Sequence, residues 1–221
     1  MQLPFTLDQF LGVFAAYNRV IEPAQFVAYG LGIAAVALLF TRRAGAGRAI
    51  AAILAVLWFW TGAVYHLLYF ARIDWVAYLF GALFIVQGLL LLYTGVARRA
   101  LQFRFRADSR GILGVVLVVY AMLVYPLLNV WLGHAYPYMP VFGVTPCPTT
   151  IFTFGLLLFV DRSPGRGVPG HLLLIPFVWA LVGASAAVSL GMVEDYGLLA
   201  AGILTLGLIA ATRRAGAARQ M

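Results

Sequence analysis

The chain has no lysine, one cysteine and few charged residues, and each shortage excludes a class of function. Its fifteen basic residues are all arginine. Retinal is held by a lysine Schiff base, so a retinal cofactor and a rhodopsin-type function are excluded. With Cys147 as the only cysteine, neither an intrachain disulfide nor a multi-cysteine metal site can form.

Charge is scarce throughout the chain. Only 10% of the 221 residues are charged, 64% are hydrophobic, and the mean hydropathy is +0.97. A soluble domain of this length would need more charge on its surface, so the excess apolar area is expected to face a lipid bilayer. The net charge of +8 would suggest nucleic acid in a soluble protein. Here the arginines fall in short loops between apolar stretches, which favours membrane topology and no nucleic-acid partner.

The apolar stretches predict an all-α integral membrane protein with seven transmembrane helices in one domain, 1–221. A helix needs about 20 apolar residues to cross the hydrocarbon core, and the fifth and seventh stretches are short. Before the first stretch, residues 5–17 predict a short amphipathic helix at the outer interface, with Asp8 and Asn18 toward water. The expected spans are 23–40, 48–70, 75–96, 111–132, 143–160, 171–190 and 196–212.

The arginines alternate between successive loops and so predict an orientation. One set of loops holds only Arg19 and Arg72, and the other set, with the C-terminal tail, holds the remaining thirteen. Because cytoplasmic loops are enriched in arginine, the thirteen mark the cytoplasm. The N-terminus is then outside and the C-terminus inside, which requires an odd number of spans. Most acidic residues fall on the outer side: Asp8, Glu22, Asp74, Glu194 and Asp195.

The sequence indicates an internal duplication. When the first three spans are aligned with the last three at a nearly constant offset, residues of types uncommon in apolar segments coincide. Spans two and three align with six and seven, and span one aligns with span five. This pattern predicts a parallel arrangement of three, one and three helices, which resembles the plan of SWEET and PQ-loop transporters. Such a resemblance implies a substrate site between the repeats. The aligned pairs are Trp58 with Trp179, Gly62 with Gly183, Asp74 with Asp195, Gly81 with Gly202, Pro23 with Pro148, and Gly30 with Gly155.

Several short runs resemble a bacterial family of multi-pass membrane proteins with no assigned function. The run Pro-Cys-Pro-Thr-Thr that begins at Pro146 is the most specific of them. The resemblance implies a protein of the bacterial inner membrane and transfers no catalytic residue. The runs are residues 17–18, 22–25, 65–66, 133–137 and 146–155.

Candidate site residues gather at the outer end. Ionisable groups at membrane depth are costly, so each is a candidate for function. The residues are Glu22, His66, His134 and Cys147, with Asp195 as a further ligand candidate. Imidazole, thiolate and carboxylate together suit zinc or copper, with Glu22, His66 and Cys147 as the metal ligands. The four come from four segments and so lack a diagnostic spacing.

A structural interpretation competes with the ligand site. Glu22 would interact with a helix N-terminus, His66 would bond to a neighbouring tyrosine, and Cys147 would pack as a small apolar side chain. Asp74 and Asp195 precede spans three and seven, where an aspartate is a common N-cap.

Three functions remain open. The favoured one is a transporter or binding protein for a small polar solute or metal ion. The second is a membrane-embedded metal-dependent enzyme, although a three-histidine site would need His171, which is expected at the opposite membrane face. The third is an accessory subunit of an oligomer or larger membrane complex.

Overall fold

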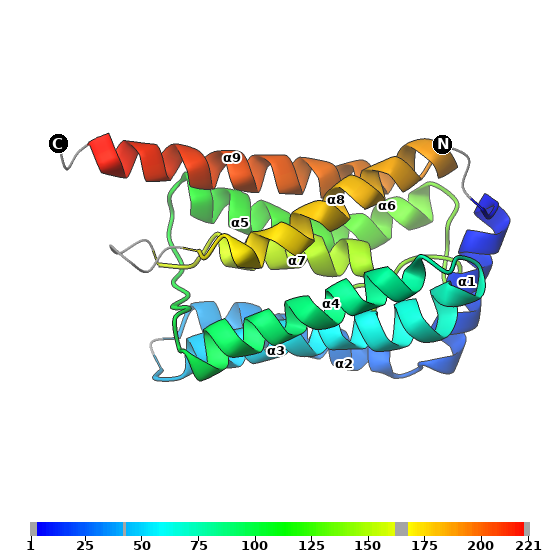
Figure 1. The fold of residues 1–221 in the computed structure, drawn as a ribbon, viewed down its shortest axis with the longest axis horizontal. Coiled ribbons are helices and arrows are strands. Elements are labelled where there is room, and N and C mark those ends of the chain that lie inside the picture. Colours follow the sequence, from blue (N-terminus) through cyan, green and yellow to red (C-terminus); the bar gives the residue numbers. More distant parts are fainter. Residues whose placement is uncertain (1–3, 42, 162–167, 219–221) are drawn as a thin grey trace.

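The computed structural model describes residues 4–41, 43–161 and 168–218, and over these residues the fold is all-α, as predicted (Figure 1). No strand occurs within these ranges, where one isolated bridge joins Phe103 to Val160. The segments η1, η3 and η4 are π-helical, and η2 and η5 are 3-10 turns. The elements are α1 (Leu7–Val20), α2 (Ala24–Leu39), α3 (Ala46–Trp60), η1 (Thr61–Tyr69), η2 (Phe70–Arg72), α4 (Ala77–Leu91), η3 (Leu92–Ala97), α5 (Ser109–Val119), η4 (Tyr120–Val124), α6 (Tyr125–Trp131), α7 (Pro146–Leu157), α8 (His171–Leu190), η5 (Val193–Asp195) and α9 (Tyr196–Ala218).

The helices run back and forth along one axis, and α1 lies across one end of the bundle (Figure 1). We call that end the acidic end; it is formed by α1 and by the connections at 21–23, 73–76, 132–145 and 191–195. The other end, where α9 finishes, is the basic end, formed by residues 40–41, 43–45, 98–108 and 168–170. The two ends therefore separate the acidic from the arginine-rich loops, as the sequence predicts.

Length and composition make the helices compatible with a membrane protein. Among the described residues, 5 helices are long and apolar enough to cross a membrane, and 6 if α1 and α2, bent by 87°, are counted as one span. The five run over Ala46–Arg72, Ala77–Ala97, Ser109–Trp131, His171–Leu190 and Val193–Thr212.

Helix α7 is shorter than the expected span at 143–160, and its burial explains why. It has 12 residues, and every residue from Met139 to Asp161 is buried. It contacts α3, α5, α8 and α9. Backbone that is not helical is tolerated at membrane depth where protein surrounds it. The turns on both sides of α7 are therefore enclosed by the bundle, and the helix need not span the hydrocarbon layer alone.

Polar side chains from neighbouring helices bond to carbonyls that prolines leave without a donor. Pro126 has no N–H for the Met122 carbonyl four residues earlier. The Tyr29 hydroxyl of α2 donates to that carbonyl at 3.1 Å. In α8, Pro176 likewise leaves the Leu172 carbonyl free.

Gln87 forms a bond between helices, because its side-chain nitrogen donates to this Leu172 carbonyl at 3.1 Å. We expect Gln87→Leu to lower the stability of the bundle by about 1 kcal/mol, since a buried carbonyl loses its donor. Thermal unfolding in detergent measures the loss. Pro176→Ala in the same chain should restore much of the stability, because an alanine there supplies the backbone N–H that proline lacks. A double variant no more stable than Gln87→Leu alone would contradict this account.

Helix α1 forms where expected but faces the protein differently. Thr6 and Gln9 form a capping box at its start. Its inner face packs against η1. Asn18, expected to face water, is fully buried, and its amide nitrogen donates to the carbonyls of Pro137 at 2.7 Å and Met139 at 2.8 Å. The prediction for Asn18 is wrong because the loop at 132–145 covers that side of α1.

The two proposed repeats pack differently. Helices α7, α8 and α9 all contact one another, whereas α3 lies between α2 and α4. Asp74 caps its own turn, accepting from the Val76 N–H at 3.0 Å. Its aligned partner Asp195 bonds across the bundle instead, to Tyr125. Residues that align between the two proposed repeats therefore make different contacts in the structure.

Candidate functional site

A buried carboxyl group lies at the centre of the acidic end. The Tyr125 hydroxyl, at the start of α6, donates to Oδ1 of Asp195 at 2.6 Å. Gly191 ends α8 in the left-handed region with φ +74, a conformation that suits glycine, and the chain then turns through η5 into α9. This turn places Glu194 and Asp195 inside the bundle, where both are buried. The expected N-cap role of Asp195 is replaced by a bond between elements.

Cys147 lies beside this carboxyl group. It is in the first turn of α7, and its side chain lies near those of Asp195, Trp179 and Tyr125. Gly183 makes room for the arrangement: a Cβ at that position would lie 2.6 Å from Cδ2 of Leu198 and 3.9 Å from the Cys147 sulfur. The close contact between Gly183 of α8 and Leu198 of α9 therefore lies next to the thiol.

His66 occupies an aromatic cage next to Trp179. Its ring centroid lies 4.8 Å from that of Phe84 and 5.1 Å from those of Tyr65 and Trp179. His66 is completely buried, and neither of its ring nitrogens has a hydrogen-bond partner. The indole N–H of Trp179 also meets no acceptor at hydrogen-bonding geometry. Buried polar groups are normally bonded, and His66 differs from the buried amides of the bundle in that both of its side-chain polar atoms lack a partner. The π-helical segment η1, which carries His66, is of a type often found at functional sites.

His134 connects the buried acids to the surface. Its Nδ1 lies 3.4 Å from Oε1 of Glu194, and its side chain is 17% exposed. The second carboxylate oxygen of Glu194 is buried without a partner. The His134 backbone N–H bonds to the Asn129 carbonyl at 2.9 Å, which holds the loop against α6. Polar groups therefore follow one another from the loop at His134 to Asp195 and Cys147.

Glu22 lies apart from these groups. It is exposed, and its Oε1 accepts a hydrogen bond from the Tyr136 hydroxyl. Desolvation and this bond raise the pKa of Tyr136 to about 12, so the phenol stays protonated and donates at neutral pH. Over the described ranges, no three His, Cys, Asp or Glu side chains are placed to hold a metal ion. Glu22, His66 and Cys147, each of which is described, thus do not form the expected three-ligand set.

A family model covers residues 7–220, almost the whole chain. The chain belongs to DUF6064, a family of unknown function. The expected membership in a family without assigned function is confirmed. Neither a curated protein nor a solved structure matches the chain.

In this DUF6064 member the predicted site residues separate into groups. Cys147 and Asp195 lie together, and His66 joins them through Trp179. His134 reaches them through Glu194. His171 starts α8 and lies 2.9 Å from the Thr94 hydroxyl at the basic end, as expected.

The sequence interpretation missed Tyr125, Trp179 and Glu194 as members of the site. Two signals were present: Glu194 and Asp195 are adjacent acids beside an apolar run, and Tyr125 precedes a helix proline. Neither signal shows which segments meet in space.

Proposed function

We propose that the chain is a seven-span protein of the bacterial inner membrane that binds a small polar solute at the acidic end and moves it through the bundle. The span number is supported by adding the short apolar helix α7 to the five long apolar helices and to the bent pair of α1 and α2. The arginine bias supports a cytoplasmic basic end.

The proposed duplication rests on sequence register and one packing feature. The aligned residues Trp58 and Trp179 both pack on Phe84, with ring centroids 4.3 Å and 5.1 Å away. If the triplets arose by duplication, their packing has since diverged, because α7 is enclosed in the bundle. Transporters with parallel repeats bind substrate between the two halves, and Phe84, in α4 of the first half, contacts Trp179 of the second half.

The observation that carries the proposal is a set of buried polar atoms without partners beside a buried acid. The His66 nitrogens and the Trp179 N–H offer donors and an acceptor, and Asp195 with Glu194 offers carboxyl oxygens. A small uncharged solute rich in hydroxyl or amide groups matches this set. The chemistry favours such a solute over a metal ion, because the nearby ligand types do not converge.

Entry of a solute would require the helices to move. The cavity beside Trp179, between α4 and α8, has a volume of about 10 Å³, roughly the space of one water molecule. Helices of the two halves would have to rock apart, as in transporters built from two bundles. The break between α1 and α2 and the π-helical segments are places where such movement could be absorbed.

Osmotic swelling of proteoliposomes tests the proposal. Glycerol, urea and acetamide serve as probes, and each uptake rate is compared with that of protein-free liposomes. We expect faster uptake of at least one probe and a loss of about tenfold or more in Asp195→Asn, since a charged hydrogen-bond acceptor contributes about 1.5–3 kcal/mol. Asparagine still accepts from Tyr125, so the fold should persist.

Asp74→Asn is the matched control, because Asp74 occupies the aligned position and caps only its own turn. Its uptake rate should equal that of the unchanged chain. Equal losses in the two variants would assign the effect to stability. Uptake no faster than in protein-free liposomes for any of the three probes would reject the transport proposal.

A further inference from the structure

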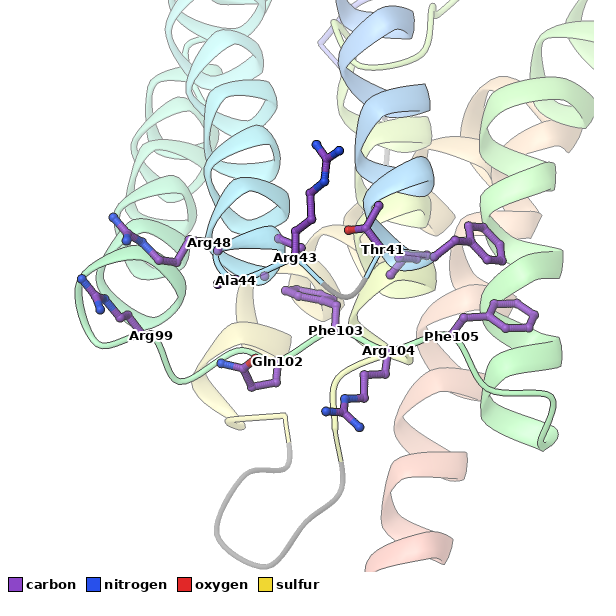
Figure 2. Close-up of a pocket in the computed structure, with 14 residues that line it drawn as sticks. Thr41, Arg43, Ala44, Arg48, Arg99, Gln102, Phe103, Arg104 and Phe105 are labelled. Atoms are coloured by element: carbon purple, nitrogen blue, oxygen red, sulfur yellow. The ribbon is translucent and has the colours of Figure 1, made fainter.

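A second site lies at the basic end, outside the cluster around Asp195. A cavity of about 810 Å³ opens there between the start of α3 and the chain that follows η3 (Figure 2). Four arginines line it: Arg43, Arg48, Arg99 and Arg104. Figure 2 shows Arg48 and Arg99 on one side of Phe103 and Arg104 on the other.

These arginines have no anionic partner among the residues that the structure describes. The ion pair nearest in the chain joins Arg106 to Asp161 at 3.4 Å, and Arg106 does not line the cavity. An uncompensated cluster of four guanidinium groups around one cavity attracts an anion. Guanidinium groups bind phosphate through paired hydrogen bonds, which a single point charge does not provide.

Helix α3 adds to the positive potential of the cavity. Its first turn holds no acidic residue, and its N-cap, Gly45, makes no side-chain hydrogen bond. Gly45 has φ +93, which a residue with a Cβ rarely adopts. The free N–H groups of a helix start carry a partial positive charge and bind anions. Here the helix start and the arginines face the same cavity.

The close packing of the chain after η3 shapes the cavity. A Cβ at Gly47 would lie 2.5 Å from the Leu101 backbone oxygen, so glycine is needed where this segment crosses the start of α3. Phe40 and Phe105 form an aromatic pair at the rim, with ring centroids 4.9 Å apart, and both are exposed. The cavity thus combines four exposed arginines with an exposed aromatic pair at its rim.

The geometry points to a binding site for a phosphate group in this cavity, held by Arg48 and Arg99 and by the N-terminus of α3. Arg104, on the other side of Phe103, adds to the positive potential of the cavity (Figure 2). A phosphate group can come from the headgroup of an anionic phospholipid or from free phosphate. The exposed rim of Phe40 and Phe105 would accommodate the start of an acyl chain. Clusters of arginine beside membrane helices have the same preference for anionic lipid.

Binding to the full chain in detergent tests the site. Native mass spectrometry with phosphatidylglycerol or phosphatidylcholine forms one arm. Thermal unfolding with inorganic phosphate or with chloride at equal ionic strength forms the other. Binding of phosphatidylglycerol without an effect of inorganic phosphate would identify a lipid headgroup, and stabilisation by inorganic phosphate alone would identify free phosphate. Both results support the site, and no effect in either arm overturns it.

Variants decide whether the cavity is responsible. Arg48→Gln with Arg99→Gln should weaken binding about tenfold or more, because each lost arginine removes a charge-assisted hydrogen bond. Arg98→Gln is the matched control: it removes the same charge one residue away, from a side chain that bonds to the Tyr93 hydroxyl at 3.0 Å and does not line the cavity. Gly47→Ala keeps all the arginines but deforms the cavity, and it should also weaken binding. Equal binding by all these variants would overturn the site.

Discussion

His66→Phe is expected to raise the melting temperature of the protein and, at the same time, to abolish solute uptake. The cage around His66 is aromatic, formed by Tyr65, Phe84 and Trp179 among others. A phenyl ring matches the aromatic character of such a cage and removes the two unbonded ring nitrogens of His66. An unsatisfied buried polar group costs about 1–3 kcal/mol, so its removal should stabilise the fold by an amount of that order. The uptake rate should fall to that of protein-free liposomes if the ring nitrogens bind the solute.

The two measurements separate a binding role from a structural one. Melting temperature in detergent and swelling of proteoliposomes are recorded on the same preparation. His171→Phe is the control, since His171 is exposed at the basic end, and both measurements should remain close to those of the unchanged chain. A lower melting temperature for His66→Phe would mean that the nitrogens hold the fold together. The polar interior would then be a structural cap and not a solute site.

Most of the helix positions could be predicted from the sequence because they depend on local signals. Apolar run length and the spacing of arginine loops place the helices without knowledge of their neighbours. α7 is the exception, because its length reflects enclosure by four other helices, which no local signal reports. Asn18 was placed toward water for the same reason: the loop that buries it lies more than a hundred residues later in the chain.

The sequence predicted several residues of the site but not which of them contact one another. Cys147 and Asp195 were chosen because ionisable groups at membrane depth are costly. An aspartate before an apolar run looks the same whether it caps that helix, as Asp74 does near α4, or bonds to a neighbour, as Asp195 does. Glu22 resembled Cys147 in its position before a proline, yet one side chain is exposed and the other is buried. Only the packing of the helices distinguishes these cases.

Labelling of single cysteines should place the acidic end outside the cell and the basic end inside. Asp8, Ala44 and Arg104 are suitable positions, since none of the three is buried. Gly47 is not, because a Cβ there would meet the Leu101 carbonyl. In a Cys147→Ala chain, Asp8→Cys should react with a membrane-impermeant maleimide in cells whose outer membrane has been permeabilised but whose inner membrane is intact. Ala44→Cys and Arg104→Cys should react only after the inner membrane is permeabilised.

We expect each introduced cysteine to react from one side of the membrane only, because many arginines favour a single orientation. In the sequence, thirteen of the fifteen arginines fall in the same set of loops and tail as Ala44 and Arg104. Each arginine near an anionic membrane surface contributes on the order of 1 kcal/mol, so the difference between the two sides far exceeds thermal energy. The unchanged chain, with Cys147 buried, serves as the unlabelled control. If Arg104→Cys reacted before the inner membrane is permeabilised, the proposed orientation would be wrong. If Asp8→Cys and Arg104→Cys reacted from the same side, the number of spans would differ from seven. Either result would move the solute-binding cluster and the arginine cavity to other faces of the membrane than those proposed.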